Sequence, residues 1–179
     1  MKTSVFVGTS LDGFIARLNG AFDFLSSGGG EVDGDSNGYN AFFSTVDAVL
    51  MGRNTYEVVL PFPKWPYGTT PVFVLSSRPI PPGPSGAVVE HISGPPTAVL
   101  SQLAARAFQH LYVDGGVTIQ QFLRAGLISR IVVTRVPVLI GTGIPLFGVL
   151  GADIPLEHIS TRVLSGGAVQ SEYVVPTVA

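Results

Sequence analysis

Residues 111–122 read LYVDGGVTIQQF, in which a short apolar run meets two adjacent glycines and then the start of a helical pattern. The run 111–115 has the aliphatic and aromatic composition of a buried strand. The segment 118–127 has the composition of a helix and reaches Gly126 where a helix C-terminus favours glycine. Gly115 and Gly116 therefore stand where a strand passes directly into a helix. They could form only a tight turn, or they could let the backbone approach a ligand closely.

The alternation of strand and helix continues on both sides of this stretch. Because strands separated by helices pair in parallel, the order predicts one α/β domain over residues 1–179 with a mostly parallel central sheet. The last fifty residues read as consecutive strands with glycine turns, which predicts an antiparallel C-terminal edge. The expected strands are 4–10, 47–52, 71–77, 87–93, 111–115, 129–140 and 173–176, and the expected helices are 39–46, 54–60, 97–108 and 118–127.

Composition excludes several classes of function. The 179 residues carry a formal net charge of −2, and only two of the ten basic residues are lysines. Such a chain lacks the basic surface that nucleic-acid binding requires. The chain has no cysteine, which excludes disulfides, zinc–thiolate sites and a cysteine nucleophile. We find no signal-peptide pattern and no apolar run near the ~20 residues that span a bilayer, so we expect a cytoplasmic protein that does not enter a membrane.

Two strand ends resemble the one at Gly115–Gly116. MGRNTYE (51–57) ends a strand at Gly52 and opens a helix, whose free N–H groups, together with Arg53 and Thr55, suit an anion. An ordinary helix start with a solvated arginine fits equally well. LSSRP (75–79) places two hydroxyl groups and an arginine after the next strand. Three such junctions at successive strand ends favour a ligand with several phosphates, such as a dinucleotide with an additional ribose phosphate.

Acidic residues occur at two further turns. Asp12 in SLDGFIA (10–16) either faces a substrate heterocycle or belongs to a simple Asp-Gly turn. DGDSNG (33–38) matches the first half of a calcium loop, but Ser44 stands where such a loop has glutamate. A polar turn is therefore the favoured interpretation of residues 33–38, and we expect no metal site.

Taken in order along the chain, these motifs carry a resemblance. SLDGFIA, MGRNTYE, VLSSRP, LYVDGGVTIQQFLRAGLI and PVLIGTGIPLF resemble the dihydrofolate-reductase-like superfamily, in particular the C-terminal reductase domain of the bifunctional riboflavin biosynthesis protein and its stand-alone relatives. The resemblance implies a three-layer α/β/α fold, NADPH as cofactor, a small-molecule substrate and a homodimer. It also implies hydride transfer to a C=N bond or a ring-opened sugar, as in 5-amino-6-(5-phosphoribosylamino)uracil reductase.

The same resemblance assigns roles to individual residues. It implies that Gly52, Arg53, Asn54 and Thr55 contact the phosphates of the cofactor, and that Ser76, Ser77 and Arg78 hold its 2′-phosphate end. Gly115, Gly116, Val117 and Thr118 would hold its pyrophosphate. The catalytic candidates Ser10 and Asp12 would lie beside the nicotinamide and the substrate. Related reductases hold a cis Gly-Gly peptide here, so we expect one between Gly115 and Gly116.

The chain also departs from the family it resembles. These 179 residues contain no counterpart of the zinc-binding deaminase domain of the bifunctional enzyme, and Arg17 and Arg135 are candidates for holding a substrate ribose phosphate by position only. Dihydrofolate reductases carry an acid on the helix after the first strand, where this chain has a glycine-rich segment containing Asp33 and Asp35. Reduction of dihydrofolate, and a non-catalytic NADP-binding dimer, therefore remain alternatives. For a dimer, we expect the apolar strand 131–140 to furnish the interface.

Overall fold

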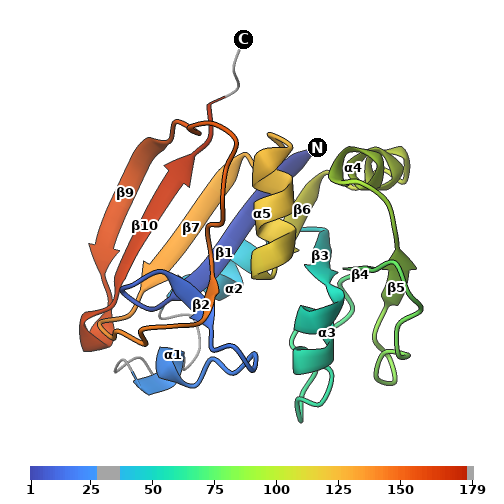
Figure 1. The fold of residues 1–179 in the computed structure, drawn as a ribbon. Coiled ribbons are helices and arrows are strands. Elements are labelled where there is room, and N and C mark those ends of the chain that lie inside the picture. The colour runs from blue at the N-terminus through green and yellow to red at the C-terminus, as the bar shows by residue number, and fades with distance from the viewer. Residues whose placement is uncertain (28–36, 177–179) are drawn as a thin grey trace.

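The computed structural model describes residues 1–27 and 37–176, in which eight of ten strands form one sheet in the order β5-β4-β3-β6-β1-β7-β10-β9 (Figure 1). The strands are β1 (Lys2–Thr9), β2 (Phe14–Ala16), β3 (Ala48–Gly52), β4 (Val72–Leu75), β5 (Val89–Ile92), β6 (His110–Asp114), β7 (Arg130–Arg135), β8 (Ile144–Pro145), β9 (Glu157–Val163) and β10 (Val169–Val174). The helices are α1 (Phe24–Ser27), α2 (Tyr39–Phe43), α3 (Arg53–Val59), α4 (Pro96–Ala105), α5 (Gly116–Arg124) and the 3-10 turn η1 (Ser165–Gly167).

The pairing of the strands confirms the predicted architecture. β5, β4, β3, β6, β1 and β7 are parallel neighbours, whereas β10 is antiparallel to both β7 and β9. The parallel part therefore ends at β7, and the C-terminal strands add the expected antiparallel edge.

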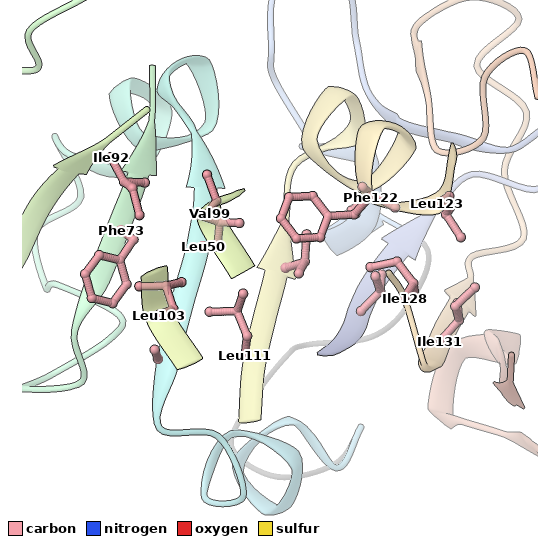
Figure 2. Close-up of a cluster of buried hydrophobic side chains, with 14 of the residues drawn as sticks. Leu50, Phe73, Ile92, Val99, Leu103, Leu111, Phe122, Leu123, Ile128 and Ile131 are labelled. Carbon is pink, nitrogen blue, oxygen red and sulfur yellow. The ribbon is translucent and has the colours of Figure 1, made fainter. Parts of the chain in front are cut away.

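Alternating side chains of the central strands fill two cores, one on each face. In β3, Ala48 and Leu50 join the core beneath α4 and α5, while Val49 and Met51 join the core beneath α2 and α3. Figure 2 shows the first core, where Val99 and Leu103 of α4 and Phe122 and Leu123 of α5 meet side chains of the sheet. Because both faces of a parallel strand are buried, these strands are continuously apolar, and the result is the three-layer α/β/α arrangement.

The expected strand 129–140 is too long. The chain leaves the sheet after Arg135, since Pro137 has no N–H to donate and the N–H of Val138 closes a local turn onto the carbonyl of Val136. β7 lies inside the sheet between β1 and β10, and Ile131–Val133 are buried. Residues 131–133 therefore cannot provide the surface that we expected for a dimer interface.

Four short or exposed elements escape sequence reasoning: β2, β8, β9 and α1. β9 is exposed at every residue, so it lacks the apolar alternation by which a half-buried strand is recognised. β2 and β8 pair with each other in a separate ribbon, with Phe14 opposite Pro145 and Ala16 opposite Ile144. This ribbon matters for function because it packs against the start of α5.

Candidate active site

A cavity of about 690 Å³ lies along the carboxyl ends of the parallel strands. Gly8 of β1, Gly52 of β3, Leu75 of β4, Asp114 of β6 and Ser93, just after β5, all line it. Since the carboxyl ends of parallel strands share one edge of the sheet, five strand ends contribute to a single elongated space. The three junctions singled out in the sequence are brought together here.

Two glycines let the helices α3 and α5 approach each other at this edge. A Cβ atom on Gly52 would lie 2.8 Å from Oγ1 of Thr118, and a Cβ atom on Gly115 would collide with Oγ1 of Thr55. Each helix thus presents a threonine hydroxyl to the glycine that precedes the other helix. The backbone N–H groups at both helix starts and the two hydroxyl groups gather in one place, as an anion site requires.

The Gly115–Gly116 peptide is trans, because the described residues contain no cis peptide bond, and our expectation of a cis bond is wrong. Gly115 makes the turn instead with φ 88° and ψ 132°, a backbone conformation that side chains disfavour. Gly116 has a different role, since a Cβ atom there would lie 3.0 Å from Cδ1 of Ile15 and 3.1 Å from the carbonyl oxygen of Pro145. The first glycine is needed for conformation and the second for close packing against the β2–β8 ribbon.

Arg53 lines the cavity, and two of its nitrogens already have partners. Its Nε donates to Glu57 at 2.7 Å and its Nη1 donates to the carbonyl of Pro79 at 2.7 Å. These bonds fix the guanidinium group beside the turn that follows β4. A cation held in place in this way can attract an anionic ligand without first losing side-chain entropy.

The turn after β4 is only partly in the cavity. Ser76 and Ser77 line it, but Arg78 does not. The Ser76 hydroxyl donates to the carbonyl of Arg78 at 2.7 Å and accepts its N–H at 3.0 Å, which closes a tight turn. The structure therefore separates Arg78, an exposed residue, from the other residues expected to hold the cofactor.

Among the described residues that line the cavity, Asp114 is the acidic one, and the motifs in the sequence did not predict a role for it. It ends β6, it is partly buried, and one of its carboxyl oxygens accepts the N–H of Gly115 at 2.8 Å. Burial raises the pKa of this carboxyl group to about 6, although the Gly115 N–H acts to lower it. An acid at the end of a central, fully apolar strand was the available signal, because the carboxyl end of such a strand is where ligands bind.

Ser10 and Asp12 do not line the cavity. Asp12 is exposed and accepts the N–H groups of Gly141 at 2.8 Å and Ile140 at 3.3 Å. The Ser10 hydroxyl and then these N–H groups lower the pKa of Asp12, while Ser10 itself is buried and accepts the N–H of Phe14 at 3.0 Å. The structure thus gives Asp12 contacts that tie the turn after β1 to residues 140 and 141. The catalytic roles expected for both residues stay predictions.

The remaining wall of the cavity is apolar and comes from the segment between β2 and α3. Leu25 of α1 lies over Gly8, within 3.0 Å of the position of a Cβ atom there, and Val58 of α3 lies against Gly20 in the same way at 3.3 Å. Phe22 and Ile15 complete this wall. The side chains come from β2, from α1 and the loop before it, and from α3, so no local motif in the sequence predicts them.

The other expected sites lie elsewhere. Arg17 forms an ion pair with Asp23 at 2.8 Å and Arg135 is exposed at the end of β7; neither lines the cavity. The calcium-loop residues 33–36, including Asp33 and Asp35, lie outside the described residues. Within residues 1–27 and 37–176 there is no group of three histidine, aspartate or glutamate residues that could hold a metal ion, and no helix long and apolar enough to cross a membrane.

Comparison with known proteins decides the family. The sequence model of the RibD C-terminal domain matches residues 2–169. The chain belongs to the RibD C-terminal domain family. The resemblance read from the motifs is therefore confirmed, and the chain is a member of a family of reductases.

Three solved structures share the fold. A protein of Shewanella sp. PV-4, named provisionally as a riboflavin biosynthesis protein, is 39% identical with a TM-score of 0.90, over 99% of this chain and 100% of that one. The Thermotoga maritima diaminohydroxyphosphoribosylaminopyrimidine deaminase/5-amino-6-(5-phosphoribosylamino)uracil reductase is 16% identical with a TM-score of 0.75, over 98% of this chain and 56% of that one. Dihydrofolate reductase of Enterococcus faecalis, in complex with NADP(H), is 16% identical with a TM-score of 0.63, over 98% of this chain and 97% of that one. The last two likenesses show the dihydrofolate-reductase-like fold alone.

Proposed function

We propose that this protein is an NADPH-dependent reductase of a small heterocyclic molecule. The observation that carries the proposal is the cavity that joins the glycine–hydroxyl junctions of three strands to a partly buried carboxyl group, that of Asp114. Family membership supports a reductase, and the NADP(H) complex of the similarly folded Enterococcus faecalis dihydrofolate reductase supports the choice of cofactor.

The residues of the cavity fit a dinucleotide with phosphate groups. The missing Cβ atoms of Gly52 and Gly115 let the hydroxyl groups of Thr118 and Thr55 approach closely, which brings the two helix starts together at one edge of the sheet. The residues that would hold the cofactor are Gly52, Arg53, Asn54, Thr55, Ser76, Ser77, Gly115, Gly116, Val117 and Thr118. When bound, NADPH supplies a hydride to the electrophilic carbon of the acceptor.

Asp114 is the group of this chain that can complete such a reduction. Hydride addition to a C=N bond leaves a negative charge on the nitrogen, which must then take up one proton. A carboxyl group with a pKa of about 6 is protonated in a useful fraction near neutral pH and can donate that proton. The apolar wall formed by Ile15, Phe22, Leu25 and Val58 covers one side of the space for the acceptor and so limits the access of water to the reacting atoms.

The test of the proposal begins with cofactor binding, measured by calorimetry with NADPH and NADH separately. We expect NADPH to bind at least tenfold more tightly, because its additional phosphate meets Arg53 and the serine hydroxyls. Absorbance at 340 nm then reports oxidation of NADPH with candidate pyrimidines, pteridines and dihydrofolate. Binding of NADPH without oxidation by any acceptor would support the alternative of a non-catalytic NADP-binding module, and no binding would refute the proposal.

The assembly that we propose is a homodimer formed through β9. β9 is the last strand of the sheet, and its apolar residues Ile159 and Val163 are 49% and 73% exposed. An unpaired strand edge that also carries apolar side chains is a surface on which a second strand can pair. Light scattering should give a dimer mass for the native chain and a monomer mass for Ile159→Lys/Val163→Lys; a native monomer would refute the proposal.

A further inference from the structure

The part of the cavity that the proposed function leaves for the hydride acceptor is the apolar wall together with Asp114. Its side chains differ in chemistry from the glycines and hydroxyl groups of the strand-end junctions. Ile15 touches the position of a Cβ atom on Gly116, next to Asp114, while Leu25 covers Gly8 at the end of the neighbouring strand β1. Phe22 and Val58 extend the same wall. The cavity that contains Asp114 therefore also has an apolar wall, made of Ile15, Phe22, Leu25 and Val58.

The positive charges of the chain lie away from this wall. All ten arginines and lysines fall within residues 1–27 and 37–176, and Arg53 is the one among them that lines the cavity. Arg53 is fixed beside the turn after β4 by its bonds to Glu57 and Pro79. Arg17, the cation nearest in sequence to the wall, gives Nε and Nη2 to Asp23 at 2.8 and 3.0 Å.

A phosphate group would be disfavoured in such surroundings. Removing an anion from water costs several kcal/mol unless cations or N–H groups replace the lost hydration. The Arg53 guanidinium and the N–H groups at the starts of α3 and α5 belong to the strand-end junctions, which the proposed function assigns to the phosphates of the cofactor. The ionisable group that the acceptor would meet is Asp114, and a carboxyl group repels a second anion when it ionises.

We infer that the molecule reduced at this site is an uncharged, phosphate-free heterocycle, in contrast to the phosphoribosyl compound named for the Thermotoga maritima reductase. The inference rests on the proposed function, since it assigns the wall and Asp114 to the acceptor and the strand-end junctions to NADPH. The wall binds the apolar faces of the ring, and the carboxyl group of Asp114 binds a polar group on its edge.

A matched pair of ligands tests the inference: 5-amino-6-(ribosylamino)uracil and its 5′-phosphate, which differ only in the phosphate group. Calorimetry on the protein saturated with NADP⁺ should give at least tenfold tighter binding of the phosphate-free compound. Equal or tighter binding of the 5′-phosphate, or no binding of either compound, would overturn the inference. Binding of NADPH to the free protein is measured first, so that failure of the proposed function is recognised separately.

A charge introduced into the wall provides the second arm. Phe22 is 38% exposed, so Phe22→Arg should fold, and Phe22→Gln provides a polar control without charge. We expect Phe22→Arg to improve the affinity of the 5′-phosphate relative to the phosphate-free compound at least tenfold, and Phe22→Gln to change the ratio less than threefold. Leu25→Arg repeats the test at a second position of the wall, in α1. An unchanged ratio in both arginine variants, with NADPH still bound, would show that the wall does not contact the acceptor.

Discussion

The two parts of the cavity are built in opposite ways. The strand-end junctions, at Gly52–Thr55, Ser76–Ser77 and Gly115–Thr118, consist of backbone, glycines and hydroxyl groups that are close together in sequence. The apolar wall consists of Ile15, Phe22, Leu25 and Val58, which come from separate elements. The first part suits the invariant phosphates of a cofactor, whereas the second can change residue by residue. A reductase built like this can keep its cofactor while its acceptor changes.

The largest effect that we expect comes from Asp114→Asn, which removes the proton donor between the two parts. The value of kcat/KM should fall about 10²–10³-fold, as for loss of a general acid, while the Kd for NADPH changes less than threefold. In the native protein the carboxyl group must be protonated, so the rate should fall as pH rises through about 6, and this dependence should disappear in the variant. Steady-state kinetics from pH 5 to 9 measure both effects.

The same kinetics on Asp12→Asn decide between the two candidate catalytic acids, Asp12 and Asp114. Asp12 is exposed and bonded to the backbone at residues 140 and 141, so its loss should cost less activity than the loss of Asp114. A larger loss in Asp12→Asn than in Asp114→Asn would return the catalytic role to Asp12 and refute the role of Asp114.

The next largest effect should come from Gly115→Ala, which damages the strand-end junctions alone. Alanine is strained at φ 88°, by about 1–2 kcal/mol, and its Cβ atom would collide with Thr55. We expect the affinity for NADPH to fall about 30-fold, since the two helix starts would be pushed apart. Gly126→Ala is a matched control, because Gly126 has φ 66°, lies after the end of α5 and has no atom within 4 Å of its Cβ position. A similar loss of NADPH affinity in the control would show that backbone strain, and not the junction, causes it.

A smaller effect should distinguish the two arginines assigned to the cofactor. Arg53→Ala should weaken NADPH binding about tenfold, in line with the loss of one charged hydrogen-bond donor. Arg78 is exposed and outside the cavity lining, so Arg78→Ala should weaken NADPH binding about threefold at most and leave NADH binding unchanged. Calorimetry with both cofactors measures this. Equal affinity of the native protein for NADPH and NADH would refute the assignment of these residues to the 2′-phosphate.

The smallest effect concerns the contact between α3 and α5. Gly52 has an ordinary φ of −74°, so Gly52→Ala acts only through the 2.8 Å approach of its Cβ atom to Thr118 Oγ1. Urea unfolding should show a loss of about 1–2 kcal/mol, within the range for overpacking. Thr118→Ala removes the hydroxyl oxygen that the new Cβ atom would meet. The double variant Gly52→Ala/Thr118→Ala should therefore be about 1 kcal/mol more stable than the sum of the two single losses predicts. Strict additivity would contradict the contact.

Much of the fold could be predicted because each central strand is buried on both faces. The runs that became β1, β3, β4 and β6 are short and largely apolar and alternate with helical segments, so their type and parallel order followed from local pattern. β9 could not be found in this way, since an edge strand that is exposed at every residue leaves no apolar alternation. The end of β7 was missed because residues 136–140 stay apolar after the chain has left the sheet.

In the candidate site, too, local features could be predicted from the sequence and long-range features could not, as two Asp-Gly pairs show. By itself, the sequence determined that Asp12-Gly13 and Asp114-Gly115 each lie where a strand ends and the chain can turn through glycine. The structure confirms a positive φ at both glycines. Only the tertiary structure decided that Asp114 ends a central strand, between β3 and β1 and inside the cavity, whereas Asp12 meets the backbone at residues 140 and 141 and stays exposed. Turn formation depends on residues adjacent in the chain. The raised pKa of Asp114 depends on burial by β-strands and helices that are distant in sequence, which no local pattern encodes.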